Sequence, residues 1–121
     1  MTKRAGLIPL GLARVIGFSM RPTMAEGNVI LVRYGASVRA GQVVLARLAD
    51  GRVVAKRAVE RRTTATGRPG WWLLSDDQVV GIDSRHRGPV ADDDVLAVVL
   101  ARVWPWPRPL RHAPGDTGAA T

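Results

Sequence analysis

Residues 42–59 read QVVLARLADGRVVAKRAV, and this stretch decides the fold. Two runs rich in β-branched residues, at 42–48 and 52–59, lie on either side of Asp50-Gly51. Asp-Gly between two such runs is a strong hairpin signal, because glycine readily takes the positive φ that a tight turn requires. The stretch therefore predicts two antiparallel strands joined by a short turn.

Similar runs lie on both sides of this hairpin. Residues 12–18 (LARVIGF), 28–34 (NVILVRY), 71–74 (WWLL) and 95–104 (VLAVVLARVW) indicate further strands. Residues 19–27, 60–70 and 75–89 indicate loops, and 92–94 indicate either a single helical turn or the closure of a loop. Short strands with turn signals roughly every 8–12 residues are typical of sandwiches and barrels. The sequence predicts an all-β fold, a small twisted and partly closed β-barrel or sandwich, with a long loop at 75–89.

The length of 121 residues is that of one domain. We expect a flexible N-terminus at residues 1–11, a β domain at 12–104, and a proline-rich exit with a disordered tail at 105–121. Before the turn at 19–27 the longest uncharged run, residues 5–13, has nine residues. A membrane-spanning helix needs ~20 apolar residues. We therefore expect a cytoplasmic monomer, with peripheral contact to a membrane left open.

The composition limits the chemistry. Without cysteine the chain has neither disulfides nor thiolate metal sites, and with only two histidines, His86 and His112, we expect no metal or cofactor. The net charge of +8 raises nucleic acid or an anionic membrane as partners. The sixteen arginines, however, form no run longer than two and have acids among them, as on an ordinary solvated surface. No nucleic acid is expected, and a catalytically weak basic binding module remains the alternative.

Lys56 is one of only two lysines and stands within an apolar run. A buried lysine can lose its proton near neutral pH, whereas arginine cannot. The position alone leaves two interpretations open, a titratable amine or a lysine whose head group reaches solvent. Ser19, in Gly17-Phe18-Ser19-Met20-Arg21-Pro22-Thr23, offers a hydroxyl where a strand gives way to a turn. A neutral amine beside such a hydroxyl is a general base beside a nucleophile.

Three blocks together resemble the type I signal peptidases. Ser19-Met20-Arg21-Pro22-Thr23 is similar to their Ser-Met-x-Pro-Thr nucleophile box, and Lys56-Arg57 to their base box. Ser75-Asp76-Asp77 followed by residues 81–90 (GIDSRHRGPV) is similar to their third box. The resemblance, which covers roughly residues 12–104, implies a serine endopeptidase that removes a leader or pro-segment from a protein precursor. Its partner would be an extended peptide segment of that precursor.

The resemblance also implies roles for individual residues. Ser19 would be the nucleophile and Lys56 the general base, with an oxyanion hole in the loop of Gly17, Ser19 and Met20. Asp83 and Arg85 would form an ion pair that holds the long loop near Lys56, and Ser84 would support the same loop. Gly81 stands where the family often has a serine that hydrogen-bonds the lysine, so we expect Lys56 to be less tightly oriented here.

The sequence also resembles two related groups of proteases. Residues 41–47 (GQVVLAR) followed by 54–57 (VAKR) also resemble the self-cleaving SOS repressor proteins, which cut an Ala-Gly bond ahead of their serine. Ala5-Gly6 lies thirteen residues before Ser19, which leaves little slack for the chain to fold back. The runs VRYGA (32–36), VRAG (38–41) and GWW (70–72) resemble the short nickel superoxide dismutase maturation proteases.

A histidine is the rival candidate for the general base. His86, in the third box, would then replace Lys56 in that role.

Overall fold

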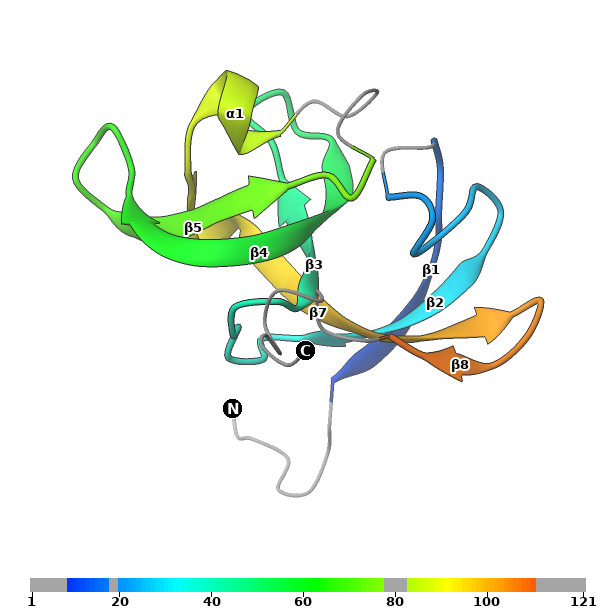
Figure 1. Cartoon of the computed structure of the whole chain (residues 1–121). Helices are drawn as coiled ribbons and strands as arrows, with labels where there is room; N and C mark the ends of the chain where they lie inside the picture. The colour runs from blue at the N-terminus through cyan, green and yellow to red at the C-terminus, as the bar shows by residue number, and fades with distance from the viewer. Residues whose placement is uncertain (1–8, 18–19, 78–82, 111–121) are drawn as a thin grey trace, which may run out of the picture.

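The computed structural model describes residues 9–17, 20–77 and 83–110, and nearly all regular structure in these residues is β (Figure 1). The strands and helices are β1 Leu10–Arg14, β2 Val29–Tyr34, β3 Val43–Arg47, β4 Val53–Thr63, β5 Pro69–Leu74, α1 Ser84–Arg87, β6 Val90–Ala91, the 3-10 turn η1 Asp92–Asp94, β7 Val95–Trp104 and β8 Arg108–Pro109. The predicted all-β class is confirmed.

The strands form one antiparallel sheet in the order β1-β2-β7-β3-β4-β5-β6, with β8 paired to β7. The long strands β4 and β7 bend, so the sheet curls into a partly closed half-barrel (Figure 1). β7, late in the chain, lies between β2 and β3 and thereby joins the N-terminal hairpin to the central one. This arrangement brings the N-terminal strand and β4 into one small domain.

Strand β3 is buried on both of its faces. Alternate side chains of a strand point to opposite sides. Val43 and Leu45 belong to one core, and Val44 and Ala46 to another on the opposite side of the sheet. The first core also contains Val15, Met20, Met24, Ile30, Val32, Ala97 and Val99, and the second Ala58, Trp71, Leu73 and Val98. This double burial explains why β3 is almost continuously apolar.

The central hairpin is confirmed, but its second strand is longer than predicted. β4 continues to Thr63 and β5 begins at Pro69, so the loop predicted at 60–70 is wrong at both ends. The polar residues remain in β4 because their side chains pack on tryptophans of the neighbouring strand β5. The guanidinium of Arg61 lies 5.2 Å from the Trp71 ring centre, and that of Arg62 lies 4.1 Å from the Trp72 ring centre. Cation–π contacts of this kind stabilise exposed strand surfaces.

The two ends of the domain also differ from expectation. β1 spans Leu10–Arg14, so it begins earlier than predicted and ends before Val15. Residue 18, the predicted end of this strand, lies outside the described residues. The proline-rich segment, expected to leave the domain, turns back: β8 pairs with β7 through Ala101 with Pro109 and Arg102 with Arg108. The strand predicted at 95–104 is confirmed, and of the two alternatives at 92–94 the structure has the helical turn.

We predict that Gly70→Ala destabilises the protein. A Cβ on Gly70 would overlap the carbonyl of Val90 on β6, which is backbone and cannot swing away. Overpacking of this kind costs about 1–3 kcal/mol. Urea unfolding should therefore show a lower midpoint. The matched control is Gly11→Ala, whose methyl would meet the movable ring of Tyr34. Equal stability of the two variants would contradict the close packing of β5 on β6.

Candidate active site

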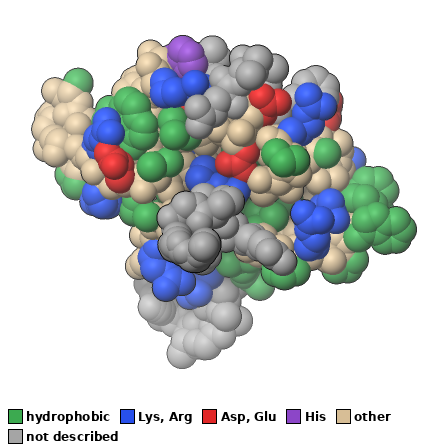
Figure 2. Space-filling model, viewed as in Figure 1, with side chains coloured by type: hydrophobic (Ala, Val, Ile, Leu, Met, Phe, Trp, Pro, Cys, Tyr) green, Lys and Arg blue, Asp and Glu red, His purple; other side chains and the backbone are tan. Residues whose placement is uncertain are grey.

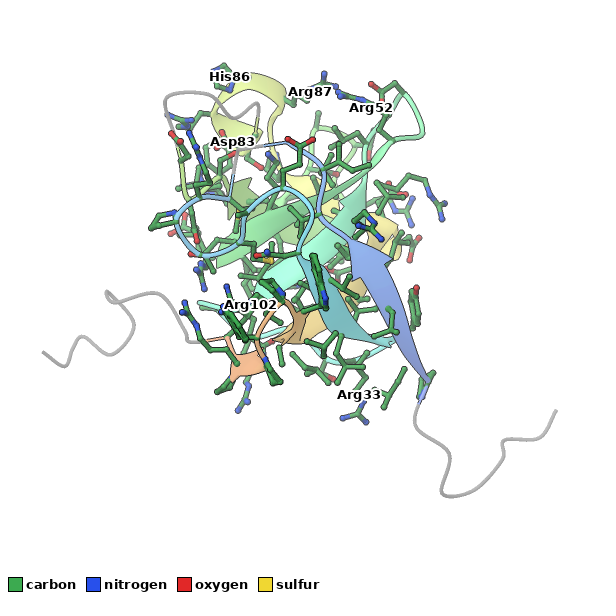
Figure 3. The ribbon with its side chains drawn as sticks, turned by 90° about the vertical axis from the view of Figure 1, so that its right-hand side faces the viewer. Arg33, Arg52, Asp83, His86, Arg87 and Arg102 are labelled. Atoms are coloured by element: carbon green, nitrogen blue, oxygen red, sulfur yellow. The ribbon has the colours of Figure 1, made fainter. Side chains whose placement is uncertain are left out.

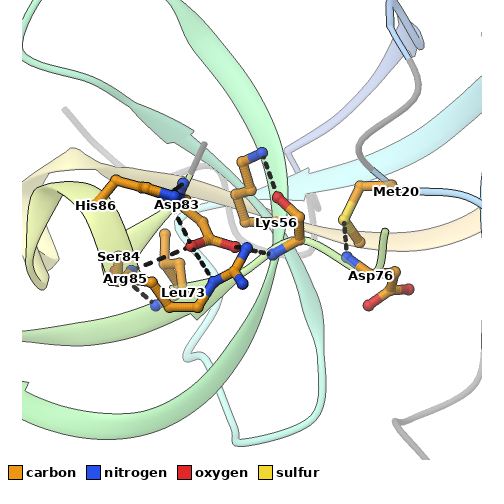
Figure 4. Close-up of polar contacts among 9 residues, drawn as sticks. Met20, Lys56, Leu73, Asp76, Asp83, Ser84, Arg85 and His86 are labelled. Carbon is orange, nitrogen blue, oxygen red and sulfur yellow. Dashed lines mark hydrogen bonds and ion pairs between the residues drawn. The ribbon is translucent and has the colours of Figure 1, made fainter. Parts of the chain in front are cut away.

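The amine of Lys56 lies inside the protein. Lys56 is only 4% exposed, and its Nζ donates a hydrogen bond to Ser75 Oγ at 2.8 Å (Figure 4). Burial lowers the pKa of this amine, and the positive charges of Arg52 and Arg85 act in the same direction, while the negative charge of Asp83 opposes them. Of the two interpretations open from the sequence, the titratable buried amine is the one that the structure supports.

The carboxylate of Asp83 organises the segment that faces Lys56. It accepts from the Ser75 amide at 2.7 Å and from Arg85 Nε at 2.9 Å, and it also caps the short helix α1 by accepting from the Arg85 amide (Figure 4). Burial opposes ionisation of this carboxyl, but the bonds from Arg85 and Ser75 outweigh burial and hold the pKa of Asp83 below its usual value. A stable negative charge therefore lies near the lysine.

Ser84 and His86 make structural contacts within the same loop. Ser84 Oγ accepts from the Leu73 amide at 2.9 Å and so attaches α1 to β5. His86 Nδ1 accepts from the Asp83 amide at 3.3 Å, which completes the capping box of α1. The His86 side chain is 47% exposed, unlike the buried Lys56. The second histidine, His112, lies outside the described residues.

Arg57, next to the lysine, ties three parts of the chain together. It donates to Asp76 through Nε at 3.1 Å and Nη2 at 2.6 Å, to the Gly41 carbonyl at 2.9 Å and to Thr23 Oγ1 at 3.2 Å. Thr23 in turn donates to Asp76. Lys56 and Arg57, which are consecutive on β4, thus contact consecutive residues, Ser75 and Asp76.

The described part of the nucleophile box is attached to this network. The Asp76 amide donates to Met20 Sδ at 3.4 Å (Figure 4), and Arg21 lies 3.9 Å from Asp77. Met20 itself is buried in the first core. Ser19, the candidate nucleophile, lies outside the described residues. Gly17 has a φ of +88°, a conformation in which any side chain would be strained.

A mostly apolar cleft of about 280 Å³ opens beside these residues. Gly17 and Met20, which flank the candidate nucleophile, line it together with Val54 and Ala55, which precede the lysine. The other lining residues are Ala13, Arg14, Val15, Ile16, Ile30, Leu45 and Val53. The sequence neighbours of both candidate catalytic residues therefore border a single cavity.

One functional contact was missed from the sequence. We expected Lys56 to lack a serine partner because position 81 is glycine, yet Ser75 supplies a hydroxyl at the start of the same motif. Gly81 itself lies outside the described residues. The available signal was that Ser75 stands where the third box of the signal peptidases usually begins with the glycine of Gly-Asp-Asn. The residue type alone, however, does not indicate which way its hydroxyl points.

The family model of the peptidase S24-like proteins matches residues 9–83, which is more than half of the chain and includes both Ser19 and Lys56. The chain belongs to the peptidase S24-like family. This result supports the broad class of serine peptidases to which the sequence motifs pointed. The comparison with curated proteins gives no significant match.

Two further observations concern this S24-like domain. Among its described residues, no helix is both long and apolar enough to cross a membrane. The same part of the chain contains no group of three or more His, Asp or Glu side chains placed to hold a metal ion.

We predict that Asp83→Asn reduces the loss of folding stability at low pH. Because the folded pKa of Asp83 is lowered, its stabilising contribution is complete above the unfolded pKa of about 3.9 and is lost as the pH falls through the folded value. Urea unfolding of the S24-like domain from about pH 6 to about pH 2 should show that the free energy of unfolding falls less steeply in the variant than in the wild type.

The matched control is Asp93→Asn, which breaks the exposed pair with Arg68. Exposed pairs contribute little, about 0–1 kcal/mol, so the control should follow the wild-type curve. An Asp83→Asn curve that coincides with the wild type at every pH would rule out the buried carboxylate as a pH-dependent support of the loop.

Proposed function

We propose that this S24-like protein is a serine endopeptidase with a Ser19–Lys56 dyad, which removes a leader or pro-segment from a protein precursor. The observation that carries the proposal is the buried Lys56 amine. Its pKa is lowered, and the cleft beside its strand is bordered by the neighbours of Ser19. The family match supports peptidase activity in general.

The proposed reaction begins with proton transfer. Neutral Lys56 Nζ accepts the proton of Ser19 Oγ as this oxygen forms a bond to the scissile carbonyl carbon. Backbone N–H groups stabilise the resulting oxyanion, each contributing roughly 3–4 kcal/mol at comparable sites. The Lys56 ammonium then returns the proton to the departing amine as the peptide bond breaks. In the second half, neutral Lys56 takes a proton from water as the water oxygen forms a bond to the acyl carbon. The Lys56 ammonium then returns this proton to Ser19 Oγ as the ester bond breaks, which releases the acyl group as a carboxylic acid.

The substrate we propose is an extended peptide lying beside β1. The cleft is lined by the end of β1 and the beginning of β4, and its small and branched residues, such as Ala13, Val15 and Ala55, suit apolar side chains. A strand added at a sheet edge gains main-chain hydrogen bonds, while pockets select alternate side chains. The resemblance of residues 32–41 and 70–72 to nickel superoxide dismutase maturation proteases makes that precursor our first candidate substrate.

The distribution of charge favours the enzyme over the basic binding module. Arg61 and Arg62, which could have met phosphate, are paired with Asp92 and Glu60 and stack on tryptophans. On the face drawn in Figure 2, basic side chains lie among acidic and apolar ones. Figure 3 places Arg52 and Arg87 at the opposite end of the molecule from Arg33 and Arg102. The positive charge is therefore dispersed, unlike a nucleic-acid stripe.

The first test removes the dyad. Ser19→Ala and Lys56→Met should each lower kcat on the order of a thousandfold or more, because each removes a participant in proton transfer. Lys56→Arg should be equally inactive, since the guanidinium stays protonated. The measurement is mass spectrometry of a synthetic peptide library with a small residue before each cut. Intact-mass analysis of the chain itself would report self-cleavage at Ala5-Gly6.

His86→Ala is the control for the rival base. Because His86 is half exposed and used in capping α1, this variant should retain most of the activity. Wild-type turnover by Lys56→Met together with loss of activity in His86→Ala would replace the dyad with a histidine mechanism. Strongly salt-dependent binding of DNA or RNA by an inactive chain would favour the binding module instead.

The pH profile provides a separate prediction. Only neutral Lys56 can accept the proton, so kcat/KM should rise with pH through the pKa of Lys56 and then level off. Because burial lowers this pKa, the midpoint should lie below the ordinary lysine value of about 10.4. The free energy of unfolding should also rise with pH between the folded and unfolded pKa values, and Lys56→Met should abolish that rise.

A further inference from the structure

Ser75 is held more completely than an ordinary loop serine. It follows directly after β5 and is only 1% exposed. Its amide donates to Asp83 Oδ2 at 2.7 Å, while its hydroxyl lies 2.8 Å from Lys56 Nζ. The next residue, Asp76, is bound by Arg57, the residue after the lysine. Two adjacent residues of one segment are therefore paired with two adjacent residues of β4.

We propose that Ser75 is the positioning residue that orients the Lys56 amine for proton transfer. This inference rests on the proposed peptidase function and adds a residue to its machinery. A neutral amine has two N–H groups and one lone pair. When one N–H is held by Ser75 Oγ, that direction is taken, so the lone pair is confined to the two remaining staggered positions about the Cε–Nζ bond. A proton acceptor held in place reacts faster than one that must first find its orientation.

The backbone contacts of Ser75 support this role. A hydroxyl can orient its partner only if its own residue is fixed, and the bond from the Ser75 amide to Asp83 provides that fixation. Asp83 is in turn held by Arg85, and Ser84 attaches the same loop to Leu73 of β5. The orientation of the lysine thus depends on a chain of contacts that ends at Ser75 Oγ.

The same hydrogen bond affects the charge state of the amine. A hydroxyl oxygen accepts more strongly from an ammonium than from a neutral amine, so Ser75 favours the charged form of Lys56. Asp83 acts in the same direction, whereas burial, Arg52 and Arg85 favour the neutral form. Removal of the hydroxyl should therefore have two separable effects: a lower pKa of Lys56, and a slower reaction even when the amine is fully neutral.

The experiment uses Ser75→Ala and exploits the scarcity of lysine. In a Lys3→Arg background, Lys56 is the only lysine, so NMR of a chain labelled with ¹⁵N and ¹³C lysine follows its titration directly. The cleavage assay is run on the same samples across the pH range. Ser75→Ala should shift the NMR titration of Lys56 to lower pH and reduce the plateau kcat about ten- to hundredfold.

Two variants separate orientation from stability. Ser75→Thr keeps the hydroxyl and should restore both the titration midpoint and most of the plateau rate. Val98→Ala reduces the side chain of a buried residue on β7, a strand that is separated from β4 by β3, and serves as a variant of lowered stability. It should unfold at lower urea concentration but leave the Lys56 titration and the plateau kcat unchanged. Circular dichroism verifies that each variant is folded.

The result that overturns the proposal is a Ser75→Ala variant whose Lys56 titration and plateau kcat both match the wild type. A drop in kcat of equal size in Ser75→Ala and Val98→Ala, with the titration midpoint unmoved in both, would also overturn it, since stability alone would then explain the loss. Failure of the peptidase function is recognised separately. In that case the wild type cleaves nothing, the positioning role falls with the activity, and the NMR titration still reports the contact with Ser75.

Discussion

The burial of one amine sets the conditions that the rest of the structure meets. An isolated ammonium in an apolar interior is very costly, so a buried lysine either loses its proton or finds polar partners. Both apply to Lys56: burial lowers its pKa, and Ser75 and Asp83 provide polar or charged partners for its amine. No side-chain nitrogen or oxygen buried within the described residues lacks a hydrogen-bond partner. The fold therefore excludes water from the amine and replaces the lost hydration with a few fixed groups.

The sheet fixes the register on which these contacts depend. β3 packs into a core on each side and pairs with β4, placing Val44 opposite Lys56 and Val43 opposite Arg57. A slip of one residue would send every side chain of β4 to the other face. The two buried faces of β3 make such a slip expensive, because it would expose one apolar set and bury polar groups in its place. Precise placement of the lysine is thus a property of the neighbouring strand.

Local patterns sufficed for much of the fold but not for the contacts of the site. The Asp50-Gly51 turn and the apolar strand at 95–104 are encoded over a few residues, so they could be predicted. The continuation of β4 through Arg61 and Arg62 could not, because polar residues resemble a loop until their tryptophan partners are known. The bond from Lys56 to Ser75 joins residues nineteen positions apart and depends on the direction of a rotatable hydroxyl. Ser19 lies outside the described residues.

The cluster of Arg57, Asp76 and Thr23 has a consequence for how a ligand would engage the protein. Three segments that are distant in sequence meet there before any ligand arrives. None of the three residues lines the cleft, but Thr23 and Arg57 lie close in sequence to Met20 and Ala55, which do, so the cluster limits how far these lining residues can move. An encounter should therefore behave as association with a nearly rigid receptor. A stiff mimic of an extended strand loses little conformational entropy when it enters the cleft. Under that condition it would dissociate more slowly than a flexible peptide of the same composition.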